Sequence, residues 1–337
     1  MAKAWMAAVL AGGLVVAAPA TAQSYNDLYV FGDSLVDSGN ARAARLASGG
    51  VDPAPPSLGY YEGRFSNGFN FADFLAMSIT GRPATAAAFG GTNFSVGGAQ
   101  AAEVLGDASP SFAEQIGFFD ISGRAFNSNS LVLVTLGGND IRSELAKLRT
   151  PGYTPTLAPA LDAFRTGLGS LLDRGARNIV VTGLPDVGQI PAVTTLGIPQ
   201  LSGAGTQLSF GLNQAFGQTV SGLATQTGAN LQFFDLFAYQ ASIYADPAAF
   251  DLPGTLDMRN ACLDVPGAAA SGCQGYVYFD PVHPTSPVHS AIANGLIGQL
   301  GIGAVPEPST WFMMMLGLGM AGAGLRQRRR EPARVPA

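Results

Sequence analysis

Residues 131–140 have the sequence LVLVTLGGND. The apolar and β-branched run over residues 131–136 predicts a strand buried on both faces, and it ends at two glycines. Strands of this kind occur mainly in parallel sheets that helices cover on both sides. This stretch therefore predicts an α/β fold, with polar residues placed directly after a central strand.

The chain on either side of this run alternates between short apolar segments and segments of helical periodicity, as expected for a parallel sheet in a single α/β domain. In such sheets ligands bind beyond the carboxyl ends of the strands, so candidate chemistry should follow strands. The sequence predicts five strands, at residues 28–31, 92–96 (the weakest), 131–136, 178–182 and 231–235, and helices at 69–79, 112–119, 157–172, 207–224 and 286–300. A polar start at Ser66 and Asn67 is expected for the first helix.

The composition argues against two classes of protein. The 337 residues include 18 Lys and Arg against 23 Asp and Glu, a formal net charge of −5, which disfavours a nucleic-acid binder. Two Cys and two His disfavour a Cys/His zinc site, because structural sites need four such ligands.

Residues 1–22 have the pattern of a secretory signal peptide. Lys3 supplies the positive start, residues 5–18 are apolar, and Ala20-Thr21-Ala22 is a small-x-small cleavage pattern. The alternative is a buried N-terminal helix. Export permits a disulfide, and we predict one between Cys262 and Cys273, the only two cysteines.

The C-terminus has a three-part pattern. VPEPST at residues 305–310 leads into an apolar run at 311–325, which is shorter than the ~20 residues of a comfortable membrane span. Arg326 and residues 328–330 then form a basic stop. The pattern resembles the PEP-CTERM sorting signal of Gram-negative bacteria that make exopolysaccharide.

That resemblance implies processing by an exosortase, a transient membrane anchor, and a final location at the cell surface, in the extracellular matrix or in the medium. A plain tail anchor is the alternative. The predicted organisation is a signal peptide at 1–22, a folded domain at 23–305, a sorting segment at 306–330 and a tail at 331–337.

The two histidines of the predicted domain differ in their surroundings. Asp280 precedes His283 by three residues on a segment bracketed by prolines, so its carboxylate can reach the imidazole and fix its tautomer. A surface Asp and His that merely neighbour each other are the alternative. His289 falls on the last predicted helix and is expected to be a packed or surface residue.

Ser34 directly follows the first predicted strand and is a candidate nucleophile. It does not fit the G-x-S-x-G elbow, because the residue two positions later is Val36. The alternative role is a helix N-cap.

Candidate oxyanion donors follow two other strands. Asn139 offers an amide NH2, and Gly97 or Gly98 offers a backbone N–H that a substrate can approach closely. Turn formation and helix capping are the alternatives for these residues.

Four blocks in order resemble the GDSL, or SGNH, esterases and lipases. They are GDSL at residues 32–35, NFSVGGA at 93–99, GGND at 137–140, and Asp280-x-x-His283. FGDSLVDSGN at 31–40, GRFSNG at 63–68 and GLP at 183–185 further resemble the plant-type and related bacterial branch. The resemblance implies a flavodoxin-like, three-layer α/β/α fold and hydrolysis of ester bonds without a cofactor.

Carried over block by block, the resemblance makes Ser34 the nucleophile and one oxyanion donor, with Gly98 and Asn139 as the others. Asp280 would orient His283, the general base. The choice between Gly97 and Gly98 stays open, as does the ester: a lipid, an acetylated sugar or a small molecule. The competing hypothesis is a catalytically inactive surface protein that binds exopolysaccharide.

Overall fold

The structure, a computed structural model, describes residues 24–303, 317–318 and 320. Residues 24–302 form one compact unit. The predicted signal peptide at 1–22 and tail at 331–337 lie outside the described residues, as does nearly all of the predicted sorting segment at 306–330.

The main sheet contains four parallel strands in the order in which they occur along the chain. Its register places Val30 beside Leu133 and Leu133 beside Val180. The two central strands are buried along their whole length, as their apolar sequences predict. The strands are β1 (Asp27–Gly32), β2 (Ser130–Thr135), β3 (Asn178–Thr182) and β4 (Asn230–Phe234).

The prediction of a fifth strand at residues 92–96 is wrong. This segment lies beside β1 and exchanges backbone hydrogen bonds with it, such as Phe94 N–H to Val30 O at 2.7 Å, but forms only one isolated bridge to it, at Asn93. The Asn93 side chain accepts the Ser95 N–H at 3.0 Å, which bends the chain out of strand geometry. With this segment counted, the strand order matches the flavodoxin-like one.

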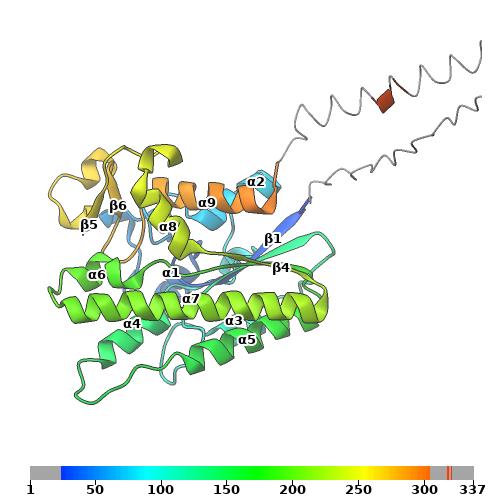
Figure 1. Cartoon of the computed structure of the whole chain (residues 1–337), viewed down its shortest axis with the longest axis horizontal. Helices are drawn as coiled ribbons and strands as arrows, with labels where there is room; N and C mark the ends of the chain where they lie inside the picture. The colour runs from blue at the N-terminus through cyan, green and yellow to red at the C-terminus, as the bar shows by residue number, and fades with distance from the viewer. Residues whose placement is uncertain (1–23, 304–316, 319, 321–337) are drawn as a thin grey trace, which may run out of the picture. The chain divides into compact units, whose positions relative to one another are not determined.

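Helices cover both faces of the sheet, which gives three layers (Figure 1). On one face lie α2, α8 and α9; on the other lie α3, α4, α5 and α7. The helices are α1 (Asn40–Ala47), α2 (Phe71–Thr80), α3 (Phe112–Ile121), α4 (Gly138–Lys147), α5 (Ala158–Asp173), α6 (Pro191–Thr194), α7 (Pro199–Thr227), α8 (Leu236–Ala245) and α9 (Ser286–Leu300).

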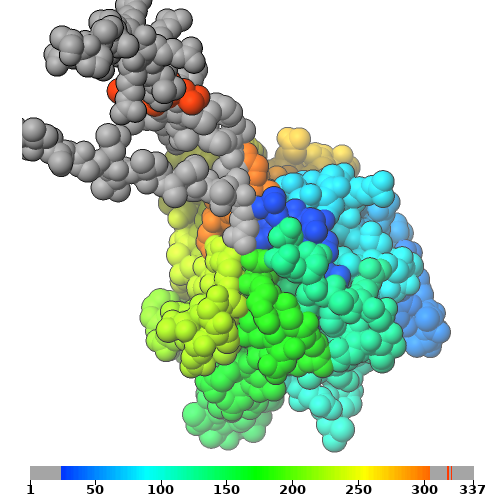
Figure 2. Space-filling model, turned by 90° about the vertical axis from the view of Figure 1, so that its right-hand side faces the viewer, coloured from blue at the N-terminus to red at the C-terminus, as the bar shows by residue number. Residues whose placement is uncertain are grey.

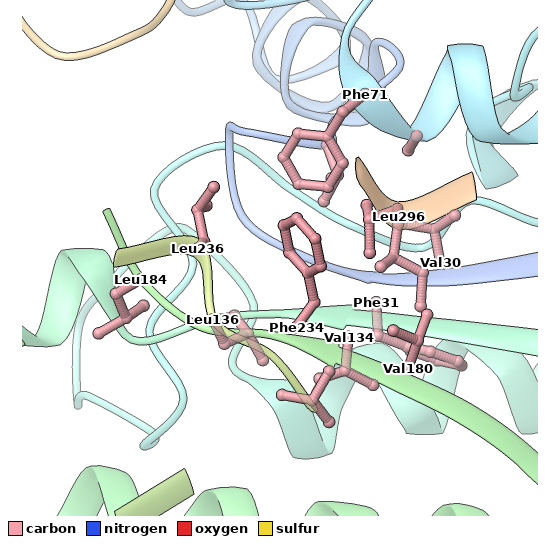
Figure 3. Close-up of a cluster of buried hydrophobic side chains, with 14 of the residues drawn as sticks. Val30, Phe31, Phe71, Val134, Leu136, Val180, Leu184, Phe234, Leu236 and Leu296 are labelled. Carbon is pink, nitrogen blue, oxygen red and sulfur yellow. The ribbon is translucent and has the colours of Figure 1, made fainter. Parts of the chain in front are cut away.

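Apolar side chains fill the space between the sheet and the α2–α9 layer. Figure 3 shows Phe71 of α2 and Leu296 of α9 directed toward the sheet, where they approach Val30 and Phe234. Phe71 and Leu296 are completely buried. Figure 2 views the molecule from the side on which the first described residues of the chain (blue) lie. The candidate site residues follow the carboxyl ends of the strands.

The helix predictions hold best where the termini carry clear signals. The prediction for α9 is confirmed to the residue, whereas α7 begins eight residues before the predicted start. The expected polar start of α2 is wrong: Asn70, not Ser66 or Asn67, caps it through a reciprocal pair of bonds with Asp73. Asn67 instead accepts the N–H of Ser286 at the start of α9.

A second, two-stranded parallel sheet, absent from the prediction, pairs β5 (Asp257–Ala261) with β6 (Tyr276–Tyr278). It matters for the site because the segment that carries Asp280 and His283 leaves β6 directly. Among the residues that the structure describes, no helix has the length and apolar character needed to span a membrane.

Candidate active site

Ser34 lies in a tight turn at the carboxyl end of β1. The turn is closed by the Asp33 carboxylate, which accepts the Leu35 N–H at 3.0 Å. Gln115 fixes the end of the strand, because its amide both donates to and accepts from the backbone of Gly32 at 2.9 Å. A Cβ on Gly32 would lie 2.6 Å from the Thr135 carbonyl oxygen, so only glycine allows β1 to end this close to β2.

Asp280 and His283 face each other on the short loop after β6. Asp280 Oδ1 accepts the backbone N–H groups of Val282 and His283, each at 2.8 Å. Its Oδ2 lies 2.7 Å from His283 Nδ1. Phe279 N–H donates to the His283 carbonyl at 2.8 Å and closes the loop, so the carboxylate and the imidazole are fixed relative to each other.

The other imidazole nitrogen of His283 reaches across the chain to the serine. His283 Nε2 lies 2.7 Å from Ser34 Oγ, a contact between residues 249 positions apart. Burial alone would raise the pKa of Asp280, but the His283 charge and the hydrogen bonds to the carboxylate outweigh it and lower the pKa to about 2. Asp280 is therefore an anion at neutral pH, with its charge directed at the imidazole.

The backbone N–H groups of Gly97 and Gly98, which follow residues 92–96, differ in their hydrogen bonding. The Gly97 N–H donates to Asp37 Oδ2 at 2.8 Å, whereas the Gly98 N–H makes no hydrogen bond within the described part of the chain. Gly98 has φ +90°, and a Cβ there would lie 2.5 Å from Ser109 Oγ. This arrangement favours Gly98 over Gly97 as an oxyanion donor.

Asn139 lies in the first turn of α4, directly after β2. Its Nδ2 donates to the Ala99 carbonyl at 2.9 Å, and its Oδ1 accepts from Arg142 at 3.2 Å, which orients the amide. One N–H of the amide thus ties α4 to the Gly98–Ala99 backbone, and the NH2 group has a second hydrogen to donate.

Two buried carboxylates support the loops around the serine. Asp37 accepts four backbone N–H groups, from residues 39, 40, 41 and 97, and burial nevertheless raises its pKa to about 6. Asp33, beside Ser34, is also buried, and desolvation raises its pKa to about 7. Neither residue was singled out from sequence; the signal available was their place within residues 31–40.

Two aromatic residues from the segment before α2 also enter the site. The Tyr60 hydroxyl donates to Asp280 Oδ2 at 2.8 Å, and the Phe65 ring lies 5.1 Å from the His283 ring. Sequence reasoning missed both, although Phe65 belongs to the GRFSNG stretch at residues 63–68.

Cys262 and Cys273 form a disulfide, as expected. With Ala268 and Phe279 they make a small buried group, packed by Tyr60 among others, which we call the disulfide cluster. His289 is 1 % exposed on α9, its ring 5.7 Å from Phe71, and burial lowers its pKa to about 3. His289 is thus a packed residue.

No group of three Asp, Glu, His or Cys side chains suited to a metal ion occurs in the described ranges. The site instead contains a hydroxyl, an imidazole and a carboxylate hydrogen-bonded in series at the carboxyl edge of a parallel sheet. This is the constellation of a serine hydrolase.

Residues 28–296 match the family model described as GDSL-like Lipase/Acylhydrolase, and the chain belongs to this family. It is a hydrolase that acts on ester bonds. Residues 304–330 match the model of the PEP-CTERM protein-sorting motif, which indicates export and C-terminal sorting.

Curated relatives carry related names. The chain is 29% identical over 181 residues to Lipase 1 of Photorhabdus luminescens, a match covering 53% of this chain and 25% of that protein. It is 27% identical to a GDSL esterase/lipase of Arabidopsis thaliana, over 85% of this chain and 92% of the relative. Among solved structures, a catalytic mutant of an acetylxylan esterase from Geobacillus stearothermophilus is 14% identical with a TM-score of 0.44, covering 84% of this chain and 98% of the other.

Proposed function

We propose that this protein is an exported serine esterase that works through an acyl-enzyme on Ser34. The observation that carries the proposal is the unbroken series from Asp280 through His283 to Ser34 Oγ, with both imidazole nitrogens 2.7 Å from their partners. A catalytically inactive binding protein would have no need to keep this series intact.

In the first half of the reaction Ser34 Oγ attacks the ester carbonyl carbon while His283 Nε2 takes the hydroxyl proton. The resulting oxyanion accepts hydrogen bonds from the N–H groups of Ser34 and Gly98 and from the Asn139 amide. Collapse of this intermediate breaks the bond to the alcohol oxygen, which leaves with the proton from His283. Ser34 is left acylated.

In the second half a water molecule attacks the acyl carbon, and His283 takes its proton. The same donors hold the second oxyanion. When it collapses, Ser34 Oγ recovers its proton from His283 and the carboxylic acid departs. Asp280 stays ionised throughout, because its pKa is lowered to about 2, and it stabilises the imidazolium that forms in each half.

The first test is Ser34→Ala with a short-chain p-nitrophenyl ester. We expect turnover to fall to the background rate with little change in the melting temperature, because the nucleophile is lost while the turn keeps its backbone bonds. The matched control is Ser128→Ala, which changes an exposed serine just before the start of β2, whereas the site residues follow the carboxyl ends of the strands. Full activity of Ser34→Ala would overturn the mechanism.

The proposal extends to the fate of the chain. Export would remove residues 1–22, and an exosortase would process the segment at 306–330 after a transient membrane stage. The intact mass of the mature protein tests this: both ends should be missing. A mass that still includes Arg330 would favour a plain tail anchor.

The natural substrate is an ester of a lipid, an acetylated sugar or a small alcohol. A screen of p-nitrophenyl esters of increasing acyl length, run beside an acetylated polysaccharide, separates these classes. Preference for acetyl groups on the polymer would assign the enzyme to matrix carbohydrate, and preference for long acyl chains would assign it to lipid.

A further inference from the structure

Asp280 receives one hydrogen bond from a distant part of the chain. The Tyr60 hydroxyl lies 2.8 Å from Asp280 Oδ2, the oxygen that lies 2.7 Å from His283 Nδ1. The other oxygen is occupied by the loop's own N–H groups, at Val282 and His283. Within the described residues, Tyr60 is the one donor to this carboxylate from outside its loop, from 220 positions away.

The Tyr60 ring is held in place from two sides. It packs edge-on against Phe279 of the disulfide cluster, with ring centroids 5.0 Å apart, and lies 6.4 Å from Phe65. The chain reaches this position through Gly59, which has φ +90°, and a Cβ at this residue would lie 3.6 Å from the Phe279 ring. The hydroxyl is thus aimed at Asp280 by packing as well as by its hydrogen bond.

The phenol stays protonated at every working pH. Burial and the adjacent Asp280 charge raise the pKa of Tyr60 above its ordinary value of 10.0. When a neutral group donates a hydrogen bond to a carboxylate, part of the carboxylate's negative charge is dispersed. The carboxylate then attracts a neighbouring cation less strongly. Here the neighbouring cation is the imidazolium that His283 becomes in each half of the reaction.

We propose that Tyr60 is a positioning residue of the active site that fixes Asp280 and sets how strongly His283 holds its proton. The proposal rests on the proposed function, in which His283 must take a proton and then give it up. Without the Tyr60 hydrogen bond, Asp280 would hold the imidazolium more tightly. His283 would then release its proton less readily to the leaving group and would stay protonated to a higher pH.

The test is Tyr60→Phe, which removes the hydroxyl and keeps the ring in its packing. We expect kcat to fall about tenfold with little change in KM, in keeping with loss of one hydrogen bond to a charged group. We also expect the acid limb of the kcat/KM profile to move to higher pH by several tenths of a unit. The matched control is Tyr61→Phe, whose ring packs against Phe69 at 5.2 Å and which should change neither quantity.

A second measurement does not depend on activity. The His283 imidazole is titrated by NMR in the wild type and in Tyr60→Phe, and the midpoint should be higher in the variant. An unmoved midpoint together with an unmoved acid limb would overturn the proposal, even if kcat fell. Absence of ester turnover in the wild type would overturn the proposed function instead, while a raised midpoint would still support the role of Tyr60.

Discussion

The two halves of the candidate site are supported in different ways. Ser34 follows a central-layer strand directly, and its turn is fixed by backbone bonds and by the buried Gln115 amide. His283 and Asp280 lie on a loop outside the main sheet. That loop is held by the small β5–β6 sheet, by the disulfide cluster and by Tyr60.

Because the two halves are supported differently, substitutions around Ser34 and around His283 should affect stability and activity differently. Changes behind Ser34 disturb the main core, which comprises most of the buried residues, and should cost stability. Changes behind His283 disturb a small satellite group that supports the catalytic loop, so they should lower activity together with any stability that they remove. The predictions below examine this contrast.

The largest effect is expected at the carboxylate. Asp280→Asn keeps the size of the side chain but removes the charge that stabilises the imidazolium, and it leaves an amide where Nδ1–H needs an acceptor. We expect kcat/KM to fall about 10³- to 10⁴-fold, measured with a p-nitrophenyl ester. A loss of less than tenfold would show that His283 acts without Asp280.

The disulfide comes next. Replacing Cys262 and Cys273 by serine removes a cross-link that closes a short loop, with an expected loss of ~2–3 kcal/mol in unfolding free energy. Because Phe279 and Tyr60 pack on this bridge, kcat should also fall several-fold. Urea unfolding and ester turnover measure the two effects. Unchanged kcat at full folding would mean that the cluster does not support the loop.

The smallest effect is a pH dependence of stability at the serine half. The pKa of Asp33 is raised to about 7 from 3.8, so the folded state holds this proton more tightly than the unfolded state. Its contribution to stability is present below pH 4 and is lost as pH rises through about 7. Between pH 5 and pH 8 the unfolding free energy of Asp33→Asn, measured with urea, should therefore fall less than that of the wild type.

The control for this pH effect is Asp173→Asn, which changes an exposed carboxylate and should keep the wild-type pH slope. An Asp33→Asn variant with the wild-type slope would contradict the burial argument.

Sequence patterns predicted the parts of the molecule that depend on local signals. The runs 131–136 and 178–182 are apolar enough to identify central strands, and the predicted bounds of α9 agree with a proline in its first turn and a glycine after its last residue. The strand prediction for residues 92–96 is wrong because the Ser95 N–H donates to the Asn93 side chain, and the segment does not complete a β-ladder with β1.

At the candidate site, the sequence motifs indicate the residues, but the contacts between residues far apart in the chain are visible only in the structure. The order of the blocks indicated Ser34, Asp280 and His283, and the structure brings these three together. Strand β5 is mostly polar, and only its last residue, Ala261, is buried, so its sequence has no strand signal. Tyr60 carries no motif of its own, and its partner lies 220 residues away, so only the folded chain reveals the contact.

The most direct measurement is covalent labelling with a fluorophosphonate, followed by peptide mapping. The account predicts one label, on Ser34, formed rapidly in the wild type and slowly in His283→Ala, because His283 must take the hydroxyl proton. A wild-type protein that is folded yet unlabelled, or labelled at another serine, would contradict the assignment of Ser34 as the nucleophile.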